Sequence, residues 1–254
     1  MRAQILQVNP RVKSSVEVIP MSWMDQFFFG FYPYLCMVAY FLGAWARFDR
    51  SQFTWRSQSS QFLQKRYLFW GSYLFHIGII GLFFGHFFGL LTPPWVYHAL
   101  GLSTKAKQML AIIVGAVLAI ICFIGATMLI YRRISESRIY VTSKPTDLFI
   151  ILFIYVQLII GIAGIPVSYQ NIDGSYMLLL AEWSRSILSF QPGSAALLEN
   201  VPWIYKIHLI FGMTLFLITP FTRLVHIFSA PIWMLGRPGW QIVRRNQNLS
   251  KRGV

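Results

Sequence analysis

The chain has 254 residues, of which 56% are hydrophobic and only 12% are charged, and its formal net charge is +14. A soluble domain carries about 25% charged residues, so the composition argues against a soluble globular protein. A basic soluble protein would suggest nucleic-acid binding, but long charge-free runs favour the positive-inside pattern of membrane proteins. The sequence therefore predicts a protein that lies in a lipid bilayer and binds no nucleic acid.

The N-terminal residues 1–20 are polar and mixed, with Pro10 and Pro20 and no apolar stretch. A cleavable signal peptide needs 7–15 consecutive apolar residues, which this segment lacks. We expect either a disordered tail or a start site placed too far upstream, with Met21 or Met24 as the true start.

Five segments are apolar enough to cross a membrane, which takes roughly 20 residues. The expected helices, in chain order, run over about Met24–Arg47, Tyr67–Leu91, Gln108–Tyr131, Asp147–Val167 and Pro202–Phe228. The predicted fold is an all-α membrane protein of five transmembrane helices over 23–235. A polar N-terminal tail (1–22) and a basic C-terminal tail (236–254) flank this domain.

Two connections and one proline carry further expectations. We expect 95–106 to be an outer loop, and the longer outer segment 168–202 to contain an interfacial helix over Ser175–Leu188. Pro220 should kink the fifth helix, because a proline inside a helix removes one backbone hydrogen bond.

The basic residues are distributed unevenly when the loops are assigned to alternate sides of the membrane. One side receives fifteen of them, from 47–66, 132–144 and the C-terminal end, and the other side receives seven. Basic residues are enriched on the cytoplasmic side, so we expect the N-terminus outside (periplasmic) and the C-terminus in the cytoplasm. An odd number of spans requires the termini to lie on opposite sides, in agreement with this assignment.

The two cysteines, Cys36 and Cys122, both fall inside expected helices. The sequence has no C-x-x-C-H motif for covalent haem and no Cys/His cluster typical of zinc or iron–sulfur ligation. Any iron–sulfur cluster that works with this chain must therefore lie on another chain.

Four of the five histidines lie within expected membrane helices, where ionisable side chains are costly and usually functional. His76 and His86 share the second helix, about 15 Å apart along its axis, and His208 and His226 share the fifth, about 27 Å apart. Because the two helices are antiparallel, His76 should pair with His226 near the inner face and His86 with His208 near the outer face. The unequal spacings require tilt or the Pro220 kink. His98, in the expected loop, receives no role.

Two imidazoles without a nearby thiolate or carboxylate make a poor zinc or copper site but a good axial pair for haem iron. A hydrogen-bonded core histidine is the alternative for any one of the four, and it explains two antiparallel pairs poorly. The glycine stripe Gly78, Gly81, Gly85 and Gly89 favours close helix packing at least as much as clearance for a macrocycle. Arg223, and more weakly Arg56, could pair with haem propionates or anchor the chain at the inner face.

The histidine segments resemble the gamma subunit of respiratory nitrate reductase, a dihaem cytochrome b membrane subunit. The similarity lies in Ser72-Tyr-Leu-Phe-His76-Ile-Gly-Ile, Phe84-Gly85-His86-Phe-Phe-Gly, Lys206-Ile-His208-Leu-Ile-Phe-Gly212 and Arg223-Leu-Val-His226. It extends over about 24–235 and includes Phe29-Gly-Phe-Tyr-Pro33-Tyr and Phe53-Thr-Trp55-Arg56.

This resemblance implies two haems b, with iron ligands His76 and His226 for the inner haem and His86 and His208 for the outer haem. It also implies a quinol site at the outer face beside the His86 haem, formed by Gly85, His86 and a lysine after the second helix. Lys107 fits that lysine better than Lys105. The implied partners are menaquinol or ubiquinol, and a cytoplasmic iron–sulfur subunit with a molybdenum catalytic subunit that reduces nitrate.

The predicted function is therefore quinol oxidation in the inner membrane, with electrons passing through two bis-histidine haems to the iron–sulfur subunit. The same cytochrome fold also serves other quinone-linked reductases, of the sulfur or heterodisulfide type. A proton-conducting transporter would need acidic residues within the spans, where Asp147, at a helix start, is the one found. A cofactor-free membrane anchor is the remaining alternative.

Overall fold

The computed structural model describes residues 22–51 and 65–228, and these residues are helical or lie in turns, with no strand among them. Five helical stretches are long and apolar enough to cross a membrane: Trp23–Ser51, Tyr67–Leu91, Thr104–Ser135, Pro145–Gln170 and Trp203–Phe221. The expectation of an all-α protein with five membrane helices is therefore confirmed. The predicted tails, except Ser22, and the propionate candidate Arg56 lie outside the described residues.

The first span is assembled from three helical pieces. It begins with α1 (Trp23–Gln26), continues through a π-helical turn η1 (Phe27–Phe31), and ends with α2 (Tyr32–Ser51). The hydroxyl of Ser22 accepts a hydrogen bond from the Met24 amide at 3.3 Å, which caps the start of the helix. The span is longer at both ends than the sequence predicted.

The second and third spans, α3 (Lys65–Leu91) and α5 (Thr104–Ser135), form the most extensive helix pair of the bundle. Glycines allow this close approach. A Cβ added at Gly78 or Gly81 would collide with Cys122 or Leu118 of α5, and one at Gly125 would collide with the backbone of α3. This half of the glycine stripe therefore serves helix packing.

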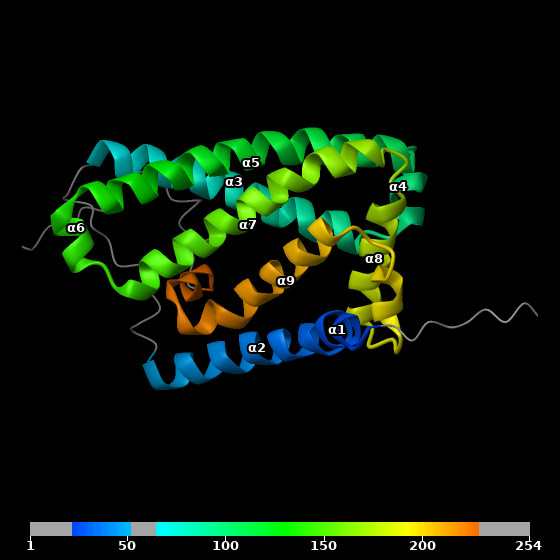
Figure 1. Cartoon of the computed structure of the whole chain (residues 1–254), viewed down its shortest axis with the longest axis horizontal. Helices are drawn as coiled ribbons and strands as arrows, with labels where there is room; N and C mark the ends of the chain where they lie inside the picture. Colours follow the sequence, from blue (N-terminus) through cyan, green and yellow to red (C-terminus); the bar gives the residue numbers. More distant parts are fainter. Residues whose placement is uncertain (1–21, 52–64, 229–254) are drawn as a thin grey trace, which may run out of the picture.

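The remaining spans continue the bundle from α5. Helix α7 (Pro145–Gln170) packs on α5, α9 (Trp203–Ile218) packs on α7, and α2 packs on α9 (Figure 1). Buried Ile150, Ile154 and Leu158 of α7 form a core with Cys122 and Ala126 of α5. Helix α3 makes its close backbone contacts with α5 and α8, and it approaches α9 mainly through side chains.

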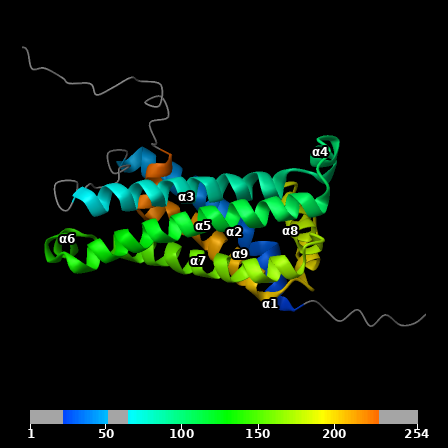
Figure 2. The ribbon, with the colours of Figure 1, turned by 90° about the horizontal axis from the view of Figure 1, so that it is seen from above.

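Short helices close the two ends of the bundle, as Figures 1 and 2 show. One end, called here the α8 end, carries α4 (Pro94–Ala99), α8 (Ser175–Leu188) and the 3-10 helix η3 (Ser194–Leu198). The opposite end, the α6 end, carries α6 (Ser137–Thr142). Helix α8 has the bounds expected from the sequence and lies across the spans (Figure 1).

The α8 end has its own hydrophobic core. Phe29 of η1 packs with Trp183 and Ile187 of α8 and with Leu198 of η3. The indole N–H of Trp183 donates a hydrogen bond to the Phe29 carbonyl at 2.9 Å. This carbonyl is free because the π-helical turn breaks the regular hydrogen-bond ladder. The first span is thus fixed to the cap of the bundle.

The expectation of one loop over 95–106 was wrong, because α4 occupies its first half. Pro93 adopts extended backbone as the N-cap and Pro94 takes the first helical position, where proline is well tolerated. Ser103 then caps α5 by accepting a hydrogen bond from the Ala106 amide at 3.2 Å. His98, expected in a loop, therefore lies on α4.

The expectation of a kinked fifth helix was also wrong, because α9 ends at Ile218 and two 3-10 turns follow it. These are η4 (Thr219–Phe221) and η5 (Arg223–Ile227), separated by Thr222 in extended conformation. Proline lacks an amide hydrogen and its ring clashes with the carbonyl four residues earlier. Arg47 of α2 donates hydrogen bonds of 2.7 Å to the carbonyls of Pro220 and Thr222, which the break leaves free.

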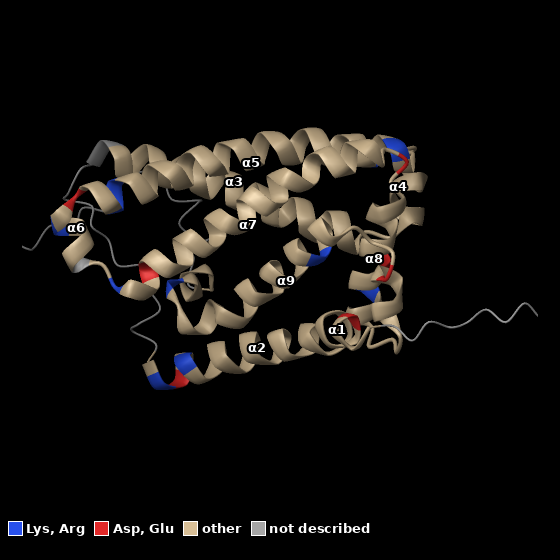
Figure 3. Ribbon diagram, in the orientation of Figure 1, with Lys and Arg blue, Asp and Glu red and all other residues tan. Residues whose placement is uncertain are grey.

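The charged residues of the described chain lie mostly near the two ends of the bundle, and the ribbon between them is almost free of charged residues (Figure 3). This pattern fits a protein whose middle lies in hydrocarbon, because an unpaired charge there is costly.

Candidate functional site

Two histidines of α3 each lie close to a histidine from the C-terminal part of the described chain. The imidazole ring centres of His86 on α3 and His208 on α9 are 5.9 Å apart, close to the α8 end. Those of His76 on α3 and His226 on η5 are 6.3 Å apart, nearer the α6 end. The structure thus brings together the same partners that the antiparallel arrangement predicted.

The element that carries His226 differs from the one predicted from the sequence. His208 and His226 were expected on one continuous helix, pointing the same way after five turns. Since α9 ends at Ile218, His226 is instead presented by the separate turn η5. The break at Pro220 is what accommodates the unequal spacing of ten residues on α3 and eighteen on the other side.

The spacing of each pair fits one metal ion held between two imidazoles. A bond from imidazole nitrogen to a transition metal is about 2 Å long, which places two ring centres on a shared metal roughly 6 Å apart. Among the described residues there is no group of three or more His, Cys, Asp or Glu side chains that could bind a bare metal ion. A macrocycle supplies the other ligands itself, so two axial imidazoles are sufficient for haem.

Three of the four imidazoles are already oriented for such a role. The Nδ1 atoms of His76 and His86 lie 2.7 Å from the carbonyls of Ser72 and Leu82, and that of His226 lies 2.6 Å from the Arg223 carbonyl. A carbonyl only accepts, so each Nδ1 carries the proton and each Nε2 keeps a lone pair. Metal-binding histidines commonly show this arrangement, because the second hydrogen bond fixes ring and tautomer.

His208 is held differently. Its Nδ1 is buried and, among the described residues, has no hydrogen-bond partner. The side-chain amide nitrogen of Gln157 on α7 donates to the His208 carbonyl at 3.0 Å and lies 3.4 Å from the His208 Nε2.

Two cationic side chains, Lys107 and Arg185, lie beside His86 at the α8 end and are called here the cationic corner. Lys107 donates a hydrogen bond to the Gly89 carbonyl at 3.1 Å, and its ammonium lies 4.3 Å from the centre of the Tyr97 ring. Arg185 of α8 approaches the next carbonyl, that of Leu90, at 3.4 Å. Both cations thus lie at the C-terminal end of α3, where the helix dipole favours positive charge.

The space around this corner is open within the described structure. A Cβ added at Gly85 or Gly89 would meet no atom within 4 Å, unlike one at Gly78 or Gly81. The Tyr97 hydroxyl is buried and has no hydrogen-bond partner among the described residues. Lys105, the other lysine considered from the sequence, is exposed.

Charged groups also gather beside the His226 pair. Arg223 lies 3.7 Å from Asp147, which starts α7, and the Arg133 guanidinium interacts electrostatically with both. One terminal nitrogen of Arg133 is buried without a hydrogen-bond partner in the part of the chain described. A haem propionate is the kind of anion that such a group would bind.

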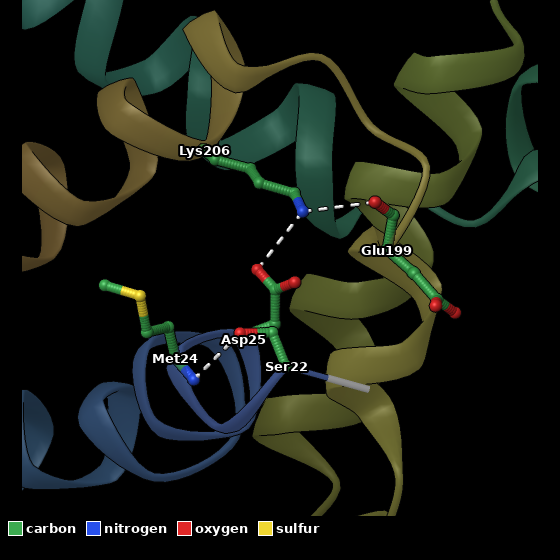
Figure 4. Close-up of polar contacts among 5 residues, drawn as sticks. All are labelled: Ser22, Met24, Asp25, Glu199 and Lys206. Atoms are coloured by element: carbon green, nitrogen blue, oxygen red, sulfur yellow. Dashed lines mark hydrogen bonds and ion pairs between the residues drawn. The ribbon is translucent and has the colours of Figure 1, made fainter. Parts of the chain in front are cut away.

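A buried ion pair joins the first and fifth spans close to His208. The ammonium of Lys206 lies 3.1 Å from the Asp25 carboxylate and 3.1 Å from the Glu199 carbonyl, as Figure 4 shows. Only 4% of the Lys206 side chain is exposed. The contact fixes the start of α9 to α1, and so fixes the position of His208 two residues later.

Sequence reasoning missed Gln157 and Tyr97, and it considered Arg185 only as a charge. The amide side chain of Gln157 inside an apolar span could have been recognised from the sequence, because polar groups within a membrane span need hydrogen-bond partners. His98, given no role from the sequence, packs its ring 4.6 Å from that of Tyr97.

Comparison with known proteins identifies the family. Residues 25–246 match the family model described as the nitrate reductase gamma subunit. The chain is 45% identical over 222 residues to the respiratory nitrate reductase 2 gamma chain of Escherichia coli K12, covering 87% of this chain and 97% of that one. It is 42% identical to the respiratory nitrate reductase 1 gamma chain of the same organism, over 88% and 99% of the two chains.

A more distant relative is the Hdr-like menaquinol oxidoreductase cytochrome b-like subunit of Archaeoglobus profundus. It is 26% identical over 178 residues, which cover 66% of this chain and 48% of that one. With its five apolar helices, the chain therefore belongs to the nitrate reductase gamma subunit family, as a multi-pass protein of the inner membrane.

Proposed function

We propose that this chain is the quinol-oxidising cytochrome b subunit of a respiratory nitrate reductase. In this proposal His76 and His226 hold one haem b, and His86 and His208 hold a second. The observation that carries it is the pair of imidazole contacts at 6.3 and 5.9 Å, each at the separation that a shared metal requires. The family membership supports the same reading.

When bound, each haem would supply reversible one-electron chemistry at a potential that its axial ligands and surroundings set. The contribution of the chain is to present four imidazoles in the correct tautomer and to exclude water. The carbonyls of Ser72, Leu82 and Arg223 fulfil the first task for three of the four imidazoles through their bonds to Nδ1. The apolar helices fulfil the second.

The α8 end is proposed to face the outside and the α6 end the cytoplasm. Basic side chains of the α6 end include Arg50, Arg133 and Arg138. In sequence, the connection 52–64 and the C-terminal tail, both outside the described residues, carry further basic residues. The α8 end carries fewer, which matches the distribution that the positive-inside rule describes. The N-terminus would then lie outside and the His86/His208 pair nearer the outer face.

Quinol would bind at the cationic corner of the α8 end, beside Gly85, His86 and Lys107. The open space at Gly85 accommodates a flat ring, and the Lys107 ammonium can donate a hydrogen bond to a quinol oxygen. The exposed Lys105 is the less suitable of the two lysines. Menaquinol and ubiquinol share the hydroxyl chemistry that this corner recognises.

The two histidine pairs would form a route across the bilayer for electrons delivered at the α8 end. Quinol oxidation there releases two protons outside, while two electrons leave at the α6 end. An iron–sulfur subunit and a molybdenum catalytic subunit would bind at that cytoplasmic end. Arg223, and Arg56 from outside the described residues, are proposed as propionate partners; Arg133 joins them because of its buried, unpartnered nitrogen.

A second candidate function is the same cytochrome in another quinone-linked reductase. The similarity to the cytochrome b-like subunit from Archaeoglobus profundus favours it, although the identity is 26% against 45% for the Escherichia coli chain. Both candidate functions use two haems, and they differ in the final acceptor of the electrons.

The visible spectrum of the purified chain tests the proposal. We expect dithionite to produce a b-type absorption, with two haems per chain by extraction, and a quinol analogue to reduce them in membranes. Nitrate should reoxidise them in the complete complex. The absence of b-type absorption would overturn the haem assignment, and haems that nitrate leaves reduced would favour the second function.

A further inference from the structure

The four histidines are not equivalent in their hydrogen bonds. Three of them have a backbone carbonyl of their own helix against Nδ1, and His208 has no such partner within the described structure. A histidine that binds iron through Nε2 carries its proton on Nδ1, and this N–H needs an acceptor in a site without water. The helix that carries His208 does not provide one.

Gln157 of the neighbouring helix α7 is the side chain that lies against the His208 ring. Its amide nitrogen is 3.4 Å from Nε2 of the ring, whose Nδ1 is the unpartnered nitrogen, and 3.0 Å from the His208 carbonyl. The bond to the carbonyl identifies this atom as the amide donor, since a carbonyl can only accept. The amide oxygen, Oε1, is buried and has no partner among the residues described.

The unsatisfied groups of these two side chains are one acceptor, Gln157 Oε1, and one donor, the His208 Nδ1–H. Burying an amide or an imidazole N–H without a partner costs about 1–3 kcal/mol for each group. Here one such acceptor, on Gln157, and one such donor, on His208, belong to side chains that touch.

Two glycines make room for the contact. A Cβ added at Gly161, one turn after Gln157 on α7, would lie 3.0 Å from Cε1 of the His208 ring. A Cβ added at Gly212, one turn after His208 on α9, would lie 3.4 Å from the Gln157 amide nitrogen. The helices thus approach closely on both sides of the amide and the ring.

We propose that Gln157 is the positioning residue of the outer haem. When iron takes Nε2, which the amide nitrogen faces in this structure, a turn of the amide and the ring would bring Oε1 to the Nδ1–H of His208, so that the two unpartnered groups satisfy each other. This inference rests on the proposed function, because it needs a haem at His86 and His208. An acceptor on Nδ1–H raises the basicity of the ligand, and a more basic ligand stabilises the oxidised iron. Gln157 would therefore lower the potential of the outer haem and leave that of the inner haem unchanged.

The test compares Gln157→Leu with Gln157→Glu in the complete complex, by redox titration followed in the visible spectrum and by electron paramagnetic resonance. Gln157→Leu removes the acceptor, so the outer haem potential should rise. Gln157→Glu offers a stronger acceptor, so that potential should fall. In both variants the His76/His226 haem should keep its potential and its resonance signal.

Tyr205→Phe is the matched control. The Tyr205 hydroxyl bonds to that of Ser168 at 2.7 Å and also connects α9 to α7, without touching His208. The Tyr205→Phe variant removes a connection between the same two helices, so the potentials and resonance signals of both haems should be unchanged. A shift as large as that of the Gln157 variants would show that general helix packing is being measured.

The outcomes separate the inference from the function it rests on. Two haems whose potentials and signals do not respond to either Gln157 variant would overturn the positioning role and leave the dihaem assignment standing. Shifts of equal sign in the two variants, or shifts of both haems, would also overturn it. A wild-type chain without haem would overturn both. Selective loss of the outer haem in Gln157→Leu, with Tyr205→Phe intact, would support the inference.

Discussion

Arg47 of α2 reaches across to the break after α9 and donates two hydrogen bonds of 2.7 Å, one to the Pro220 carbonyl and one to that of Thr222. Both carbonyls lie just before the start of η5, the turn that carries His226. The position of His226 opposite His76 therefore depends on a contact from the first span. The haem proposal makes this contact testable.

Replacing Arg47 with methionine should disturb the inner haem. The variant keeps an apolar stem but loses two charge-assisted hydrogen bonds, each worth about 1.5–3 kcal/mol. We expect a shifted potential or loss of the His76/His226 haem, measured by redox titration of the purified complex. Arg50→Met, three residues further along α2, is the control. Equal effects on both haems would contradict this account.

Single histidine variants should remove one haem each. His86→Ala should lose the haem nearer the α8 end and retain the other, whereas His76→Ala should do the reverse, because the pairs are separate. Haem content by extraction, together with the remaining potential, gives the measurement. Loss of both haems from each variant, or of neither, would refute the proposed pairing.

Lys107→Ala should slow quinol-dependent haem reduction by roughly tenfold or more, which corresponds to the loss of one hydrogen bond from a charged donor. Reduction by dithionite should be normal, since the haems themselves remain. Stopped-flow reduction by a quinol analogue provides the rate. Lys105→Ala serves as the comparison, because Lys105 is exposed. Unchanged kinetics for Lys107→Ala would remove this lysine from the quinol site.

The buried pair of Lys206 and Asp25 should show strong coupling. Asp25→Asn leaves the Lys206 ammonium buried with the Glu199 carbonyl and no counter-charge (Figure 4). Breaking such a pair from one side typically costs about 3–5 kcal/mol. Asp25→Asn combined with Lys206→Met should therefore be less destabilising than the sum of the two single variants, in thermal unfolding of the detergent-solubilised complex. Additive effects would show that the two side chains do not interact.

Gly78→Ala should destabilise the contact of α3 with α5, because the added Cβ would lie 2.5 Å from the Cys122 Cβ and 2.6 Å from its backbone nitrogen. A methyl group added at Gly115 of α5 meets no described atom within 4 Å. Gly115→Ala should therefore be neutral or mildly stabilising, since alanine favours helix by about 1 kcal/mol over glycine. The thermal unfolding midpoints of the two variants compare them directly. Equal midpoints would contradict the packing role of Gly78.

The sequence by itself determined the fold class and the number of spans. Charge-free apolar runs of this length have no stable alternative to helices in a bilayer, where every backbone polar group needs an internal partner. It also determined which histidines could meet, because antiparallel spans fix the order of depth along the chain. The helix over Ser175–Leu188 was also predictable, because its mixture of apolar and polar residues is a local sequence pattern.

The tertiary structure decided how those histidines are presented. A proline in an apolar run can kink a helix or end it, and the choice depends on partners for the freed carbonyls. Arg47, distant in the sequence, supplies them. The structure likewise divided the glycine stripe, with Gly78 against α5 and Gly85 in open space. Gln157 could be recognised beside His208 only once α7 and α9 were packed, since no local pattern connects residues on separate helices.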